Sequence, residues 1–494
     1  MIRGALRLLL PVTCVLASAV FADSDRWYVI EIAGMPCGWY HEHVEHDEDI
    51  VRSMNEERLV IARGDQRVET GQRIVFEETP DGEPLRAEVI IESGGEPTRL
   101  VYTFDGSDSV SMERSRHGRV VTETLPLDGT DWFTPEEVRR FVTARIEAGA
   151  RTIEYRTVEP GNGMQVVTVR SERIGTARFD HRGRSLEVSR WRTRTSGLPI
   201  ELVELRSTDG ILVESEAPLG IGPMRMVLTD RERAVVALEQ PAPELLHAMV
   251  IPVAGLVRSD RLQRARYVVR ADGLPSFSLP DSGAQRARLV ETGVVEIEVD
   301  AARGSKATEA ERSDPAYLAS SGAIDFGDEA VTAFVARGLE GCSRDPLVRA
   351  ATLRRAVARH MRHRHYGTAF ASASDAARTG SGDCTEHAVL LAAALRADGI
   401  PARVASGLVH GRVDEATEPG FAWHMWTQAL IGGQWIDLDA TRPLDFDAGH
   451  LLVSTSALAQ QGGEDELAAL LPLFGRLDIE RLDPEPDRPG GDDS

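Results

Sequence analysis

The chain has 494 residues, 42% of them hydrophobic and 27% charged, a balance typical of soluble globular proteins. This length is too great for one ordinary domain, so we expect two or three. The 78 acidic and 56 basic residues give a formal net charge of −22. An excess of acidic residues argues against a nucleic-acid partner and against a basic patch for membranes.

The first 22 residues have the three-part plan of a secretory signal peptide. Arg3 and Arg7 precede an apolar run that ends at Phe21, and Ala22 is a small residue before Asp23. The run is shorter than the roughly 20 apolar residues that span a bilayer comfortably. We therefore predict cleavage before Asp23 and a periplasmic or secreted protein without a transmembrane segment. A retained N-terminal anchor is the alternative.

Residues 23–238 are predicted to form a β-rich domain. Segments such as "RLVYTF" and "SLEVSRW" alternate apolar and polar residues, and Gly, Asp and Pro turns separate them. One helix interrupts the strands: Thr134 can cap it, Pro135 suits its first position, and Glu137 completes a capping box. We expect an open, curved antiparallel sheet or half-barrel around this helix, with no residues that demand chemistry.

Three further segments follow along the chain. Residues 239–310 begin with the linker "EQPAPELL" and continue as a small β module. Residues 311–482 change to apolar stripes with helical spacing, as in "PLVRAATLRRAVARH". Residues 483–494 form an acidic, Pro- and Gly-rich tail that we predict to be disordered. The whole chain is predicted to be α+β.

Outside the signal peptide the cysteines are Cys37, Cys342 and Cys384. An odd number in an oxidising compartment allows one disulfide, such as Cys37–Cys342, with one free thiol, or three free thiols. Cys384 opens the segment "CTEHAVLLAAALRADGIP", in which strong helix formers run to Arg396 before Gly399 ends the helix. The segment is apolar all round, so we predict a central, buried helix.

A predicted hairpin supplies a base and a carboxylate. The sequence "FAWHMWTQALIGGQWIDLDATRP" reads as two strands joined by the Gly-Gly pair at 432–433, which suits a two-residue turn. Counting outward from that turn places Trp426 opposite Asp439 and His424 opposite Thr441. His424 and Asp439 are then diagonal neighbours on one face, about 7 Å apart at Cβ.

These residue types suit nucleophilic catalysis. A helix N-terminus favours the thiolate form of a cysteine, which is the nucleophile. We predict Cys384 as nucleophile, His424 as its base, and Asp439 as the group that orients the imidazole. The backbone N–H of Cys384 is the expected oxyanion donor, while Tyr366 and Gln428 are weaker candidates for a second donor.

Other residues of the predicted helix and hairpin, and Cys384 itself, allow further interpretations. Trp426 and Trp435 fall on the histidine face and are predicted to line a substrate cleft. Cys384 could instead be a core cysteine, or a zinc ligand with His387 and a further histidine, but no second tight ligand pair accompanies it. Glu386 is expected to be an exposed acid of the first helical turn. We expect no metal and no cofactor.

The ordered motifs "GDCTEHAVLLAAALRADGIPARVASGLV", "WHMW" and "WIDLDAT" resemble the transglutaminase-like superfamily of papain-like cysteine enzymes, from about Pro315 to Glu480. Cys384, His424 and Asp439 match its triad, although Ala440 stands where the family commonly has proline. The resemblance implies a central Cys-bearing helix packed on an antiparallel sheet.

The resemblance also implies a reaction. It points to a thioester acyl-enzyme formed on a peptide or protein amide, and we expect the substrate in the cell envelope. In a protease or amidase, water would attack the thioester and hydrolyse it. In a transamidase, an amine would attack it instead. We expect hydrolysis to be favoured. The β-rich part is similar to N-terminal domains of bacterial envelope proteins. The alternative is therefore a non-catalytic envelope binding or assembly protein that uses the fold as a scaffold.

Overall fold

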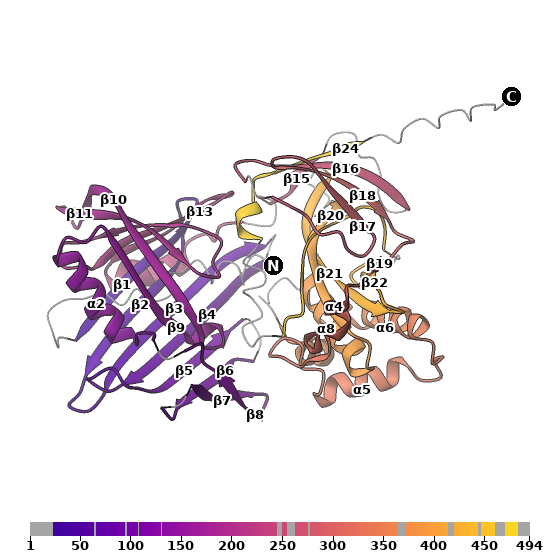
Figure 1. Ribbon diagram of the computed structural model, residues 1–494, viewed down its shortest axis with the longest axis horizontal. Coiled ribbons are helices and arrows are strands. Elements are labelled where there is room, and N and C mark those ends of the chain that lie inside the picture. The colour runs from indigo at the N-terminus through magenta and orange to yellow at the C-terminus, as the bar shows by residue number, and fades with distance from the viewer. Residues whose placement is uncertain are drawn as a thin grey trace. The chain divides into compact units, whose positions relative to one another are not determined.

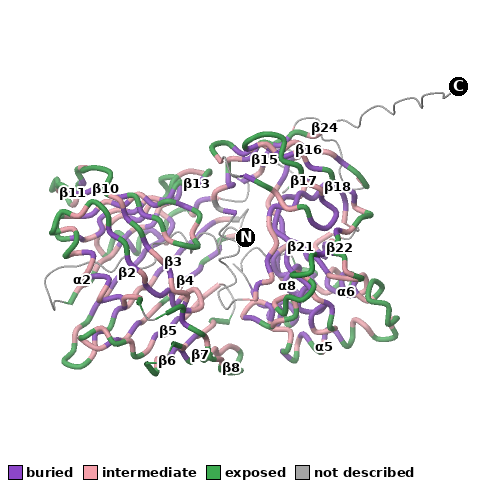
Figure 2. The backbone as a smooth tube through the Cα atoms, in the orientation of Figure 1, coloured by how far each residue is buried: buried purple, intermediate pink, exposed green. Residues whose placement is uncertain are grey.

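The computed structural model describes residues 23–482 except 64–65, 94–95, 107, 130, 245–248, 254–261, 275–276, 364–370, 413–418, 443–445 and 460–469. The predicted signal peptide and acidic tail lie outside these residues. The chain forms two compact units (Figures 1 and 2). The N-terminal unit holds residues 1–246, 365–371 and 460–472, and the C-terminal unit holds 247–364, 372–459 and 473–494. Within the described residues, no helix has the length and apolarity to cross a membrane.

The N-terminal unit is built on one fourteen-stranded antiparallel sheet. Its strand order is β8-β7-β6-β5-β4-β3-β2-β1-β14-β13-β12-β11-β10-β9, so β1 and β14 meet in the middle. The strands are β1 (Ser24–Ile32), β2 (Met35–His46), β3 (Val51–Arg63), β4 (Gln66–Glu78), β5 (Pro84–Glu92), β6 (Thr98–Phe104), β7 (Ser109–Arg116), β8 (Arg119–Pro126), β9 (Thr152–Glu159), β10 (Gln165–His181), β11 (Arg184–Thr195), β12 (Leu202–Arg206), β13 (Leu212–Leu219) and β14 (Gly222–Thr229).

One longer helix, α2 (Pro135–Glu147), connects the two end strands β8 and β9. Thr134 and Glu137 form the predicted capping box at its start, and Val138 and Val142 are buried. Val158 of β9 shares a hydrophobic cluster with Tyr102 of β6. Because residues near both ends of the strand order meet in one core, the sheet is curved, as predicted. The short helices are α3 (Arg231–Val236), η1 (Pro160–Asn162) and η2 (Ala237–Glu239).

The C-terminal unit has two antiparallel sheets and a group of helices. One sheet has the order β19-β22-β21-β20-β23, with β15 paired to β21, and the other has the order β17-β18-β16-β24. The strands are β15 (Ile251–Pro252), β16 (Arg264–Ala271), β17 (Gln285–Glu291), β18 (Val294–Asp300), β19 (Ser305–Lys306), β20 (Ala402–Gly411), β21 (Gly420–Ile431), β22 (Gln434–Leu438), β23 (His450–Ser456) and β24 (Leu477–Leu482). The helices are α4 (Glu309–Ser313), α5 (Glu329–Gly338), α6 (Pro346–His360), α7 (Ala373–Thr379), α8 (Cys384–Ala397) and η3 (Pro315–Leu318), and a further turn, η4, spans Leu471–Leu473.

Helix α8 is the centre of this unit. It packs on β20 and β21, and α5, α6 and α7 contact it from other sides (Figure 1). Every residue from Thr385 to Arg396 is buried, which confirms the predicted central helix. Gly399, which follows the C-cap residue Asp398, adopts a φ of +78°, a conformation that favours glycine and ends the helix as expected. The α+β class and the Cys-bearing helix on an antiparallel sheet are therefore confirmed.

Candidate active site

Cys384 is the first residue of α8 and is partly exposed. Asp383 caps the helix: its side chain accepts a hydrogen bond from Thr385 N at 2.8 Å. As the first helical residue, Cys384 has no intrahelical acceptor for its own N–H. The thiol and this N–H are therefore both placed at the electropositive end of a buried helix.

Glu386 completes the cap from the other side. Its carboxylate accepts a hydrogen bond from Asp383 N at 2.8 Å, and the residue is fully buried. The prediction of an exposed first-turn acid is wrong, because the capping box draws this side chain back over the turn. Gly382 makes room for it: with φ +151°, a Cβ at this position would lie 2.5 Å from Glu386 Cβ.

The hairpin β21–β22 positions His424 and Asp439. Ile431 pairs with Gln434 across the turn and the ladder continues to Thr427 and Leu438, which confirms the predicted register. Asp439 follows directly after the last paired residue. His424 Nε2 lies 3.0 Å from Asp439 Oδ2, and the two residues are 6% and 1% exposed. The two side chains therefore meet in a site closed to bulk water.

His424 also interacts electrostatically with the Cys384 side chain. Nε2 faces Asp439, so Nδ1 is the ring nitrogen left for the thiol. Burial acts to lower the pKa of His424, but the charge and hydrogen bond of Asp439, together with the interaction with Cys384, outweigh burial and raise the pKa to about 10. The imidazolium form is therefore stabilised between a thiol and a carboxylate.

Asp439 is held by more than one partner. Thr441 N donates to its Oδ1 at 2.8 Å, and His450 Nε2 lies 3.2 Å from its Oδ2. Burial acts to raise the pKa of Asp439, but the charge and hydrogen bonds of His424 and His450 lower it well below the usual value. This carboxylate is therefore ionised when it faces His424.

Sequence reasoning missed His450. This residue is 2% exposed, and its Nδ1 lies 3.1 Å from Asp447 Oδ1. It starts β23, which pairs with β20 on the side opposite β21, so His450 and His424 approach Asp439 from two strands separated by a third. No local motif in the sequence indicates that β23 lies there.

Both tryptophans predicted to line a substrate cleft are buried, each 1% exposed. The Trp426 ring stacks on His424 at 6.1 Å between centroids, and its Nε1 donates to Asp437 Oδ1 at 2.7 Å. Trp435 lies under the Arg403 guanidinium, 3.8 Å from the ring centroid. We therefore revise this assignment: Trp426 supports His424 and Trp435 belongs to the core.

Gln428 is already engaged in this network. Its amide nitrogen donates to Asp437 Oδ1 at 2.8 Å, and its oxygen accepts from Arg403 Nε at 3.0 Å. Gln428 is therefore not positioned as a second oxyanion donor. Tyr366, the other candidate, lies outside the described residues.

The three described cysteines are free thiols in the structure. Cys37 is fully buried, and burial together with the nearby Glu31 raises its pKa to about 12. Cys342 contacts Thr352 Oγ1 at 3.6 Å. Cys384 is the one of the three that faces a histidine, so it is the candidate nucleophile.

Among the described residues, no third ligand accompanies Cys384 and His387 to form a zinc site. The groups of ligand side chains that could hold a metal are Asp25–His41–His43 and His424–Asp439–His450. Neither includes Cys384 or His387, and His387 Nδ1 lies 2.6 Å from the Asp383 carbonyl oxygen. His387 therefore belongs to the first turn of α8.

Cys384 thus lies at the start of a buried helix on an antiparallel sheet, with His424 on β21 and Asp439 directly after β22. Residues 333–440, about a fifth of the chain, match the model of the transglutaminase-like superfamily. This segment of the chain is therefore a transglutaminase-like domain. No curated protein matches the sequence.

Several solved structures are similar to parts of the chain. A β-barrel-like protein of the domain of unknown function DUF1849 from Brucella abortus is 13% identical, covers 43% of this chain and 98% of its own, and has a TM-score of 0.34. A candidate cysteine protease from Cytophaga hutchinsonii is 16% identical over 44% of this chain and 81% of its own, with a TM-score of 0.28. The periplasmic domain of TgpA from Pseudomonas aeruginosa, bound to ethylmercury, is 18% identical over 37% and 74%, with a TM-score of 0.23.

Proposed function

We propose that this protein is an exported cysteine acyl-transfer enzyme that forms a thioester on a peptide or protein amide. The observation that carries the proposal is the position of His424, which interacts electrostatically with the Cys384 side chain and lies 3.0 Å from Asp439 Oδ2. The residue types suit a nucleophile, a base and an orienting carboxylate, with His424 and Asp439 buried and Cys384 partly exposed. Export is proposed from the N-terminal sequence pattern.

The first half-reaction follows from these contacts. His424 Nδ1 takes the thiol proton of Cys384, and Asp439 stabilises the imidazolium that results. The thiolate attacks the carbonyl carbon of the amide, and the oxyanion of the tetrahedral intermediate receives a hydrogen bond from the backbone N–H of Cys384. The intermediate collapses, the C–N bond breaks, and His424 returns the proton to the leaving amine. A thioester on Cys384 remains.

The second half-reaction reuses the same base. His424 takes a proton from water or from a second amine, which attacks the thioester carbonyl. The C–S bond then breaks, and His424 returns the proton to the Cys384 thiolate. We favour water as the acceptor, because the sequence offers no recognisable amine-acceptor pocket.

Pairing of the thiol with His424 can be tested by alkylation with iodoacetamide across a pH range, with the modified residue located by mass spectrometry. We expect Cys384 to react fastest of the three described thiols at about pH 6, because it is partly exposed at a helix N-terminus beside His424. His424→Ala should lower the rate at that pH by about tenfold or more, and Asp439→Asn should lower it less. His410→Gln changes another buried histidine of the same unit and should leave the rate unchanged.

The reaction itself is tested with a mixed peptide library in ¹⁸O-labelled water, with and without a primary amine. Hydrolysis of an amide introduces ¹⁸O into the released carboxyl group, whereas transfer links the amine to the peptide. Both products should disappear in Cys384→Ala. An alkylation rate indifferent to His424, together with no turnover, would instead favour the non-catalytic envelope protein.

A further inference from the structure

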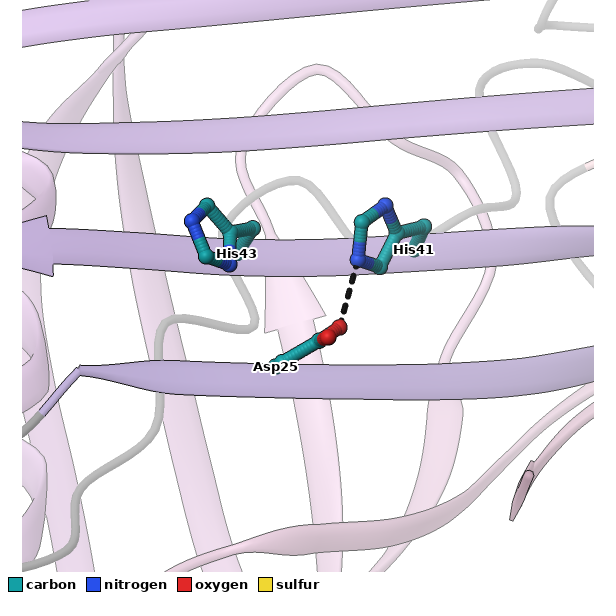
Figure 3. Close-up of side chains that lie close together, drawn as sticks. All are labelled: Asp25, His41 and His43. Carbon is teal, nitrogen blue, oxygen red and sulfur yellow. Dashed lines mark hydrogen bonds and ion pairs between the residues drawn. The ribbon is translucent and has the colours of Figure 1, made fainter. Parts of the chain in front are cut away.

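A second group of metal-ligand side chains lies in the N-terminal unit, on the sheet formed by β1 and β2 (Figure 3). Asp25, His41 and His43 each offer one ligand atom, and these atoms all lie within 4.8 Å of one another. His41 and His43 are two residues apart on one strand and therefore share a face. Asp25 pairs with His43 across the ladder. The cluster is thus a product of the strand register.

One contact in the cluster is already formed. His41 Nε2 lies 2.7 Å from Asp25 Oδ1 (Figure 3). The His41 ring also stacks on Trp27, with centroids 3.9 Å apart and planes 14° apart. Stacking fixes the plane of the imidazole, so His41 is a pre-positioned ligand beside a carboxylate.

His43 is not explained by that pair. Its Nδ1 is buried and has no hydrogen-bond partner among the described residues. A buried polar atom without a partner costs free energy, and such an atom calls for an explanation such as a bound ion or water. An ordinary His–Asp hydrogen bond accounts for His41 and Asp25, but it leaves His43 beside them without a role.

We propose that Asp25, His41 and His43 bind a divalent first-row transition-metal ion, with Zn²⁺ the ion that suits them best. Imidazole nitrogen together with carboxylate oxygen is a ligand set for Zn²⁺, Cu²⁺ and Ni²⁺. Ca²⁺ and Mg²⁺ prefer oxygen ligands alone and fit this set poorly. Three protein ligands leave the fourth tetrahedral position of Zn²⁺ to water.

The cluster must rearrange slightly to hold the ion, because the His41 and Asp25 ligand atoms, 2.7 Å apart, have to separate. Zn²⁺ with bonds of about 2.0–2.2 Å places tetrahedral ligand atoms about 3.3–3.6 Å apart. The Asp25 side chain is 63% exposed and the His41 side chain 13% exposed, so the carboxylate is the ligand free to rotate. Glu56 lies opposite His41 on β3 and adds negative charge on the same face. An ion from solution can approach the cluster from the side of the exposed Asp25 carboxylate.

This site is separate from the candidate active site. His424, Asp439 and His450 are buried in the C-terminal unit, where they are hydrogen-bonded to one another. An ion at Asp25, His41 and His43 joins β1 to β2, so it should stabilise the N-terminal unit by binding its folded form. Its loss should leave the alkylation of Cys384 unchanged.

Titration of the full-length protein, purified without a histidine tag, with ZnCl₂ in a calorimeter tests the site. We expect one Zn²⁺ per chain in this site. His43→Gln should abolish its binding, and His41→Gln should weaken it about tenfold or more. Co²⁺ should give a visible absorption band that His43→Gln removes. His181→Gln, a change on β10 outside both clusters, should bind Zn²⁺ like the wild type.

One further variant and one stability control separate the alternatives. His424→Gln should retain the Zn²⁺ site, and the thermal unfolding of His43→Gln in EDTA should match the wild type, which shows that the variant is folded. Unchanged Zn²⁺ affinity and stoichiometry in His43→Gln would overturn the proposal. So would a wild-type protein that binds Zn²⁺ only at about millimolar concentrations, or one in which His424→Gln alone removes binding.

Discussion

At the scale of single residues, the site depends on one carboxylate oxygen shared by two histidines. Asp439 Oδ2 lies 3.0 Å from His424 Nε2 and 3.2 Å from His450 Nε2. His450 is itself anchored by Asp447, at 3.1 Å from its Nδ1. We expect His450 to act as a positioning residue, because it restricts the rotation of Asp439 through a hydrogen bond to Oδ2.

His450→Leu should therefore reduce the alkylation rate of Cys384 at about pH 6 by roughly 10- to 100-fold, since a hydrogen bond to a charged group contributes about 1.5–3 kcal/mol. His450→Gln keeps an N–H donor and should recover part of the rate. The measurement is the pH profile of alkylation. A uniform rate loss at every pH, equal in both variants, would indicate a purely structural role.

The ion pair of His424 and Asp439 also makes stability depend on pH. The pKa of His424 is about 10 in the folded protein, above the value of about 6.5 for an unfolded chain. Its contribution to the free energy of unfolding is therefore fully present below about pH 6.5 and is lost as the pH rises towards 10. Urea unfolding should show a steeper loss of stability from about pH 7 to pH 9.5 in the wild type than in His424→Gln. Parallel curves would contradict this.

The three residues of the proposed catalytic site could be named from sequence because each lies in a local pattern. Cys384 follows a Gly-Asp turn at a helix start, and the Gly-Gly turn sets the register that places His424 near Asp439. His450 could not be predicted, because its position depends on the pairing of β23 with β20. The burial of Trp435 depends likewise on Arg403, from another strand.

At the scale of elements, α8 depends on the cap that presents Cys384. The Asp383 side chain accepts a hydrogen bond from Thr385 N at 2.8 Å. Asp383→Ala removes this acceptor and should lower the free energy of unfolding by about 1–2 kcal/mol, whereas Asp383→Asn keeps it and should cost less. Urea unfolding of the two variants, followed by helical circular dichroism, makes the comparison. Equal losses would assign the effect to charge alone.

Helices and strands were predicted correctly where the local sequence pattern was strong. The capping box at Thr134 and Glu137 marked α2, and alternation marked the strands of the N-terminal unit. The order in which those strands pair is harder to predict from sequence, because β1 pairs with β14, which lies almost the whole unit further along the chain. The domain boundaries at 238 and 310 remain predictions.

At the scale of the whole molecule, the two units have separate cores. Phe76 is 1% exposed in the N-terminal unit and Leu391 is fully buried in the C-terminal unit. Leu391→Ala should destabilise its own unit by about 2–5 kcal/mol, and Phe76→Ala should destabilise the other by about 3–5 kcal/mol. In calorimetry each variant should shift one transition. A common shift of a single transition would show that the units unfold together.

The sheet β17-β18-β16-β24 pairs strands that are far apart in the chain, and this affects how the protein folds during synthesis. Its strand β16 starts at Arg264, and its neighbour β24 is formed by Leu477–Leu482, more than 200 residues further along the chain. During synthesis from the N-terminus, β16 and the helix of Cys384 thus emerge long before β24, the strand that completes this sheet. Pairings of such long range form slowly, because loop closure must come first. The N-terminal unit can begin to fold during synthesis, while the Cys384-bearing unit completes its fold only after β24 has emerged.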